Sequence, residues 1–354
     1  MLAAFGCGQR PSTDPPRADP PRIAIVASER GPSGVRLVAI DERGDRQFSL
    51  ITAPRSTARD THPTISPDGA WIVFASSRER SLSETSLWIA KLGVEQPPAR
   101  LTIGPAIDSH PTWTTDGNAI IFASTRDGGD FDLYRLAVRD GRADGEPTQL
   151  TSALGHEITP SIATDGTIVY SSVTQIGERD IESHLEERAP DGTIKQLTAG
   201  PADSAPAISP DGRLLAFARP AIVEPRPNVE LWLLPHGQSE ATPVAALPLT
   251  DEGGPVWSRD GRFLFATSIM KGEQGVLFSS VIHVDLGEPR RRVRMLVDRA
   301  GAVPRLTPAI VARSLDARAL REDPEYLSEL ARIMADAIEK RARPEEPIEP
   351  EGSQ

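Results

Sequence analysis

Residues 62–69 read His-Pro-Thr-Ile-Ser-Pro-Asp-Gly, and variants of this phrase return along the chain. The further copies are 110–117 (HPTWTTDG), 160–166 (PSIATDG), 206–212 (PAISPDG) and 255–261 (PVWSRDG). The aspartates of successive copies lie 48, 49, 46 and 49 residues apart: Asp68, Asp116, Asp165, Asp211 and Asp260. Five copies at nearly constant spacing indicate an internal structural repeat.

Each copy predicts a β-hairpin followed by two more strands. The residues after the proline form a short strand, and Asp-Gly forms a tight turn because glycine accepts a positive φ. An apolar run such as 71–75 (WIVFA) follows, which is typical of a strand buried on both faces. A third strand carries a pair such as Leu87-Trp88, and a fourth ends on Leu-Thr, as in Leu101-Thr102. Four strands per repeat are one blade of a β-propeller rather than a unit of a helical solenoid.

Two fragments at the ends of the repeats complement each other. Residues 23–52 contain the second, third and fourth strands of a blade without a first strand. Residues 303–308 (VPRLTP) match the first-strand phrase but lack the Asp-Gly turn. We therefore expect an all-β, six-bladed β-propeller over residues 22–310, closed by pairing of a C-terminal strand with the N-terminal blade. Such closure would hide the edges of the sheets.

The phrase His-Pro-x-x-Ser-Pro-Asp-Gly, the following Ile-Val-Phe-Ala-Ser run, the Leu-Trp strand and the Leu-Thr ending resemble the TolB-type (WD40-like) propeller repeat. The resemblance covers about residues 22–308. It is to the propeller domain of TolB without the α/β domain that precedes it there. The resemblance implies a role in the bacterial cell envelope, although propellers of this type serve many functions.

Both ends of the chain have distinctive compositions. Residues 1–21 are expected to hold a truncated lipoprotein-like signal, with Cys7 as the lipidated residue, and a Pro-rich linker. Residues 311–342 are expected to contain a helix, because Asp323-Pro324 is a good helix start and apolar residues follow at helical spacing. Residues 343–354 are rich in Pro and Glu and are expected to be disordered.

The composition excludes several classes of protein. The formal net charge is −11, whereas a nucleic-acid-binding protein usually carries excess Lys and Arg to meet the phosphates. The single cysteine, Cys7, excludes an internal disulfide and a zinc site with several Cys ligands. Attachment to a membrane is expected only through a lipid on Cys7.

Acidic residues stand three positions before the proline of each copy of the phrase. They are Asp60, Asp108, Glu157, Asp203 and Glu252. Because the first strands of a propeller line its central channel, these side chains are expected to ring one mouth of the channel. Converging carboxylates would suit Ca²⁺ or a basic peptide. Alternatively, each acid hydrogen-bonds to backbone N–H groups of a loop.

Two histidines hold equivalent positions next to the proline, His62 and His110, and His156 lies near the corresponding place in the next repeat. His62 and His110 are candidates for binding a cation or a peptide at the channel mouth, and the three histidines together could bind a transition metal. The alternative is that each is a structural histidine bonded to a neighbouring blade.

The leading hypothesis is a non-enzymatic, exported scaffold, monomeric and located in the periplasm or on the outer membrane as a lipoprotein. It would bind an envelope protein or a peptide at the acidic channel mouth, with Ca²⁺ as the one candidate cofactor. The alternative is a metal-dependent hydrolase or lyase that uses channel histidines and carboxylates. No Gly-x-Ser-x-Gly nucleophile motif is present in the sequence.

Overall fold

The computed structural model describes residues 23–31, 34–41, 47–49, 58–92, 94, 96–176, 181–200, 202–221, 228–245, 250–272, 275–287, 292–297 and 306–309. These ranges form strands and turns, with no helix among them. No helix of the described part is therefore long and apolar enough to cross a membrane. The predicted segments 1–21, 311–342 and 343–354, including Cys7, lie outside the described residues.

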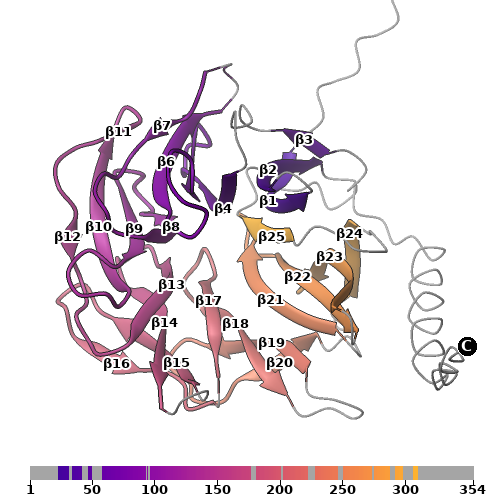
Figure 1. Ribbon diagram of the computed structural model, residues 1–354. Coiled ribbons are helices and arrows are strands. Elements are labelled where there is room, and N and C mark those ends of the chain that lie inside the picture. Colours follow the sequence, from indigo (N-terminus) through magenta and orange to yellow (C-terminus); the bar gives the residue numbers. More distant parts are fainter. Residues whose placement is uncertain are drawn as a thin grey trace, which may run out of the picture.

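The strands form antiparallel sheets arranged around a central axis like the blades of a wheel (Figure 1). The second sheet contains β8 (Asp108–Trp113), β9 (Ala119–Ser124), β10 (Asp132–Arg139), β11 (Arg142–Ala143) and β12 (Thr148–Gln149). The third contains β13 (His156–Ile162), β14 (Ile168–Gln175), β15 (Ile181–Arg188) and β16 (Ile194–Gln196). The fourth contains β17 (Ser204–Ile208), β18 (Leu214–Ala221), β19 (Asn228–Pro235) and β20 (Thr242–Ala245). The fifth contains β21 (Thr250–Trp257), β22 (Phe263–Gly272), β23 (Gly275–Asp285) and β24 (Arg292–Val297).

The first sheet joins the two ends of the described chain. It contains β1 (Ile23–Gly31), β2 (Gly34–Asp41), β3 (Gln47–Ser49), β4 (Ala58–Ile65), β5 (Trp71–Ser76), β6 (Ser86–Lys91), β7 (Ala99–Arg100) and β25 (Leu306–Ala309). Strand β25 pairs antiparallel with β1, with Val26 opposite Ala309. Strand β25 also lies between β21 and β4 and contacts both.

Hydrogen bonding divides the described strands into five sheets, whereas the sequence predicted six separate blades. The difference arises between β2 and β4, which pair in parallel through Gly34 with Ala58 and Val35 with Arg59. This short parallel contact merges the N-terminal strands with the first complete repeat into one sheet of eight strands. The all-β propeller itself is confirmed.

The core lies between neighbouring sheets, as the apolar second strands predicted. All six residues of β9 are buried. Between the first and second sheets, Val73 and Leu87 pack with Trp113, Phe122 and Tyr134. Since each second strand is covered on both sides, it needs apolar residues at consecutive positions rather than at alternate ones.

The repeated phrases each have a local structural role. In the first turn, the Ser66 hydroxyl accepts a hydrogen bond from the Trp71 N–H, and Asp68 accepts one from the Ala70 N–H. Gly69 completes this turn with a φ of 73°. In the Leu-Thr ending, the Thr102 hydroxyl accepts a hydrogen bond from the Leu87 N–H at 2.8 Å and so ties the fourth strand to the third.

Candidate functional site

The innermost strands enclose a cavity of about 460 Å³ on the propeller axis. Its described walls are β4, β8, β13, β17, β21 and the turns that follow them. In each of these strands the lining begins at the residue before the repeated proline and runs toward the Asp-Gly turn. The cavity therefore occupies the half of the channel that lies nearer these turns. Its volume lies within the range of small-molecule sites.

A β-bulge shapes the wall at the start of the lining in every repeat. The residue before the proline has a positive φ in each case: His62 (50°), His110 (48°), Thr159 (53°), Ala205 (52°) and Gly254 (59°). The pairing with the second strand shifts at the same place, for example between Thr61 and Thr64. A positive φ costs free energy for a residue other than glycine, so its presence at four such positions marks a constrained part of the channel.

The two predicted histidines, His62 and His110, meet in this cavity. Their ring centroids are 3.9 Å apart. Burial lowers the pKa of His62 to about 4, and burial and then the neighbouring His62 hold the pKa of His110 well below its usual value. Both rings are therefore neutral at pH 7. A neutral imidazole can bind a metal or exchange hydrogen bonds with a ligand.

The third histidine does not join them. His156 is exposed and accepts a hydrogen bond from the Phe131 N–H at 3.1 Å, away from the cavity lining. In the described part of the chain, no group of three or more His, Cys, Asp or Glu side chains is placed to hold a metal ion. His62 and His110 thus form a pair of potential ligands without a described third.

The five predicted carboxylates are not at an open mouth. Each lies two residues before the bulge, outside the cavity lining, and each is at most 2% exposed: Asp60, Asp108, Glu157, Asp203 and Glu252. The expectation of an open electronegative rim is therefore corrected. The surrounding protein covers these side chains.

Three of the carboxylates are neutralised by arginines of the second strand or the residues after it. Asp60 pairs with Arg78 at 2.7 Å, and Asp108 pairs with Arg126 at 3.0 Å. Asp203 accepts hydrogen bonds from Nε and Nη2 of Arg219 at 2.7 and 2.8 Å. A buried carboxylate requires such compensation, because its desolvation is otherwise costly.

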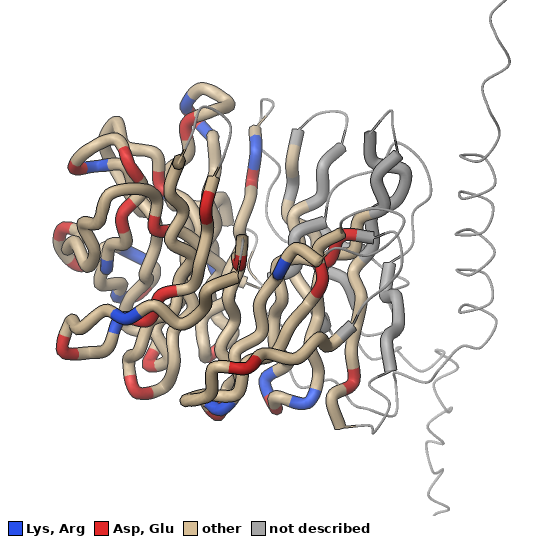
Figure 2. Tube along the Cα trace, turned by 90° about the horizontal axis from the view of Figure 1, so that it is seen from below, with Lys and Arg blue, Asp and Glu red and all other residues tan. Residues whose placement is uncertain are grey.

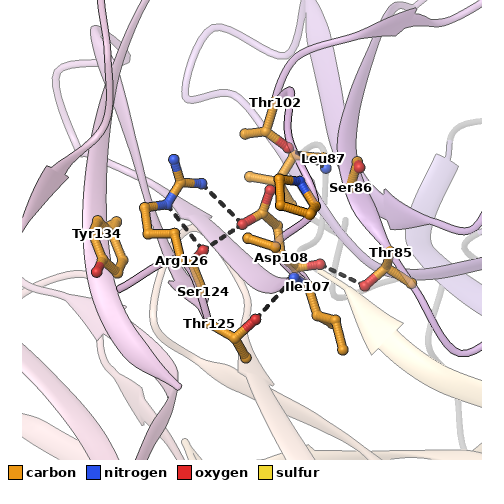
Figure 3. A network of polar contacts seen from close by, with 12 residues as sticks. Thr85, Ser86, Leu87, Thr102, Ile107, Asp108, Ser124, Thr125, Arg126 and Tyr134 are labelled. Atoms are coloured by element: carbon orange, nitrogen blue, oxygen red, sulfur yellow. Dashed lines mark hydrogen bonds and ion pairs between the residues drawn. The ribbon is translucent and has the colours of Figure 1, made fainter. Parts of the chain in front are cut away.

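The Asp108 network shows how one of these buried acids is held (Figure 3). The Asp108 carboxylate accepts hydrogen bonds from Ser124 at 2.6 Å and from Arg126. Its backbone carbonyl accepts a hydrogen bond from the Thr85 hydroxyl at 2.7 Å, and its N–H donates to the Thr85 carbonyl. Thr85 belongs to the loop before β6, in the preceding blade. The Asp108 side chain is therefore a structural latch that ties β8 to the end of β9 within its blade, while the backbone of Asp108 contacts the preceding blade.

Glu157 forms no ion pair with an arginine of the described residues, and it behaves differently. Its Oε2 accepts a hydrogen bond from the Thr151 hydroxyl at 3.1 Å. Burial and then the hydrogen-bonded carboxyl of Asp132 raise the pKa of Glu157 to about 8. Glu157 is therefore mostly protonated at pH 7, which is how a buried carboxyl group avoids an uncompensated charge.

Charged residues on the outside of the propeller gather mainly in the loops and strand ends, with both signs interspersed (Figure 2).

Arg259 belongs to the cavity lining. Its Nη2 donates to the Pro67 carbonyl at 2.5 Å, across 192 positions of the sequence. Sequence analysis missed this residue. The available signal was that Arg259 replaces the Pro or Thr found at the same place in the other copies of the phrase.

Comparison with known proteins supports the fold. Residues 80–226 match the model of the TolB beta propeller domain. A putative TolB from Agrobacterium tumefaciens superposes with a TM-score of 0.58 at 18% identity, over 81% of this chain and 91% of that one. TolB from Acinetobacter baumannii gives a TM-score of 0.64 at 16% identity, over 83% and 67%.

An enzyme is also among the similar structures. An oligogalacturonate lyase in complex with manganese gives a TM-score of 0.51 at 15% identity, over 79% of this chain and 74% of the lyase. At these identities the likeness shows the fold alone. The comparison with curated proteins produced no match.

Proposed function

We propose that this chain is a non-enzymatic, exported scaffold of the bacterial cell envelope that binds a peptide or a segment of a protein in the axial cavity. The match to the TolB beta propeller domain supports a TolB-like role. The single observation that carries the binding site is the cavity of about 460 Å³ at the centre of the ring. Its walls come from five different sheets, so the ligand would contact the whole propeller.

We propose that the ring has six blade positions and that the eight-stranded first sheet fills two of them. That sheet contains two sets of four strands, β25-β1-β2-β3 and β4-β5-β6-β7. The contacts of β25 with β21 and β4 support a closed ring of six innermost strands. A closed ring of sheets holds its channel open without a ligand, which lowers the conformational cost of binding.

The location within the channel differs from the acidic mouth that the sequence suggested. The pairing of Asp60, Asp108 and Asp203 with arginines supports a structural role for these acids. We therefore propose the cavity beyond the bulge as the binding site, with Ca²⁺ not required.

The alternative function is a metal-dependent hydrolase or lyase. One observation favours it: the neutral rings of His62 and His110 lie 3.9 Å apart in the cavity. Ser109 and His62 form a second candidate pair, which is less suited to catalysis. The Ser109 hydroxyl oxygen lies 3.3 Å from Nδ1 of His62, but Ser109 is not part of the cavity lining.

The test is selection of peptides from a random hexapeptide library on the immobilised chain. The V256W variant fills the cavity, because Val256 lines it on β21. The I194W variant is the control, since Ile194 lies on β16 and is 44% exposed. We expect enriched peptides to bind the wild type and I194W but not V256W.

Two results would count against the proposal. Enrichment that V256W retains would place the binding site elsewhere, and the absence of enrichment on the wild type would refute peptide binding. For the alternative, stoichiometric uptake of Mn²⁺ or Zn²⁺ that H62A and H110A abolish would favour the metal-dependent enzyme.

A further inference from the structure

The polar groups of the cavity wall are concentrated on one side. Strands β4 and β8 contribute the two histidines together with Thr64 and Trp113, and the neighbouring β13 adds Thr159 and Ser161. The guanidinium of Arg259 reaches this side as well, since it donates to the carbonyl of Pro67 after β4. The contributions of β17 and β21 are mainly small or apolar: Ala205, Pro206, Ala207, Ile208, Gly254, Pro255, Val256 and Trp257. The cavity thus has a polar wall and an apolar wall.

Arg259 is the only charged side chain among the described residues that line the cavity. Its hydrogen bond to Pro67 uses one of the five N–H donors of the guanidinium. The remaining donors keep the fork geometry that matches a carboxylate with two parallel hydrogen bonds. No Asp or Glu belongs to this described lining, so the charge that the lining itself offers a ligand is the positive charge of Arg259.

Buried polar atoms in the same wall have no hydrogen-bond partner within the described protein. They are Oγ1 of Thr64, Nδ1 of His110 and Nε1 of Trp113. Trp257 holds the position equivalent to Trp113 in its repeat, and its Nε1 donates to the Ala207 carbonyl at 2.8 Å. Because neighbouring protein atoms cover these three atoms, they add polarity behind this wall, and the contacts offered to a ligand come from groups such as Arg259 at the cavity surface.

We propose that the cavity binds the C-terminal end of a peptide, with the terminal carboxylate held by Arg259 and the last side chain, an apolar one, on the wall formed by β17 and β21. This inference rests on the proposed function, since it names the chemistry of the peptide that the cavity would take. A chain end fits because Arg259 lies at the end of the cavity lining that is nearer the Asp-Gly turns. An internal peptide segment would supply no terminal carboxylate for the guanidinium.

The test compares two hexapeptide libraries that differ only at the C-terminus, one with a free carboxylate and one with a carboxamide. Binding to the wild type is measured by fluorescence anisotropy for pools and for enriched single peptides. We expect the free acids to bind at least about 10-fold more tightly than the amides, in line with a charge-assisted hydrogen-bonded pair. The R259Q variant should bind both forms as weakly as the wild type binds the amides.

Two further variants make the result specific. Arg213 is exposed and lies outside the cavity lining, so R213Q changes the net charge equally and should keep the preference for acids. The R259K variant keeps the charge but loses the fork, so it should show an intermediate preference. Thermal unfolding of R259Q within a few degrees of the wild type would show that the contact with Pro67 is not required for folding.

The outcomes separate this inference from the function on which it rests. Equal binding of acids and amides that V256W abolishes would overturn the carboxylate and leave the cavity as the peptide site. A preference for acids that R259Q retains would overturn the role of Arg259. Displacement of the peptides by oligouronates, with tighter binding of the sugar acid, would replace the peptide by a carbohydrate carboxylate. Absence of any peptide binding would refute both proposals.

Discussion

Replacing Arg126 by methionine tests whether the acid at the start of each first strand is a structural latch. The Asp108 carboxylate is 2% exposed, and the Arg126 side chain is 18% exposed. Removing one partner of a buried ion pair costs about 3–5 kcal/mol, because the remaining charge stays buried without compensation. The partial exposure of Arg126 and the remaining hydrogen bond from Ser124 reduce this cost. We therefore expect R126M to lower the free energy of unfolding by about 3 kcal/mol, near the lower end of that range.

Packing changes little in this substitution. The Arg126 guanidinium carbon lies 5.3 Å from the centre of the Phe122 ring and 5.0 Å from that of Tyr134. Methionine retains favourable contacts with such rings through its sulfur. Most of the expected loss is therefore electrostatic.

The assay is equilibrium unfolding in urea at pH 7, followed by tryptophan fluorescence. The control is R139M, because Arg139 forms an ion pair of 2.8 Å with Asp144 while its side chain is 77% exposed. An exposed pair contributes about 0–1 kcal/mol. The double variant D108N/R126M removes the buried charge together with its partner, so it should be more stable than R126M. The latch would be refuted if R126M lost no more stability than R139M, or if the double variant recovered nothing.

Three further predictions concern the stability contributed by Glu157, Trp257 and Thr151. The raised pKa of Glu157, about 8, means that the folded state holds a proton that the unfolded state releases near pH 4.5, so stability should fall as the pH rises from about 5 to 8. The variant E157Q should flatten this dependence in thermal unfolding measured across that range, and an unchanged slope would contradict the assignment. W257F should cost about 1–2 kcal/mol more than W113F in urea, because of these two indoles only that of Trp257 has a hydrogen-bond partner among the described residues, and equal losses would argue against it. T151V should lower stability by about 1–3 kcal/mol, since it leaves the Leu133 N–H unsatisfied; the exposed substitution T148V, measured in parallel, should have little effect.

Local chemistry allowed much of the fold to be predicted. An Asp-Gly turn depends only on residues within the hairpin, such as Ser66, Asp68 and Gly69. The continuous apolar runs of the second strands predicted burial on both faces, and β9 is indeed buried throughout. The positions of His62 and His110 next to the repeated proline correctly placed both histidines at the channel.

Local sequence patterns could not predict the number of separate sheets, nor which side chains surround the repeated carboxylates such as Asp60 and Asp108. The parallel contact between β2 and β4 involves two residue pairs and has no sequence signature. The carboxylates recur in register, but the register does not show which way the side chains turn. The later Arg78 and Arg126, each 18 residues after its acid, were visible in the sequence, yet their meaning depends on the pairing of the strands.

By itself, the sequence determined the repeat, the hairpins and the strands of this protein, because turn geometry and burial of apolar residues act over short distances along the chain. Only the tertiary structure decided that three of the recurring acids form buried pairs with arginines of their own blades and that Arg259 lies over the cavity beside Pro67. These contacts join residues that strand pairing and the arrangement of the sheets bring together, and charge interactions depend on distance and burial in space rather than on separation along the chain.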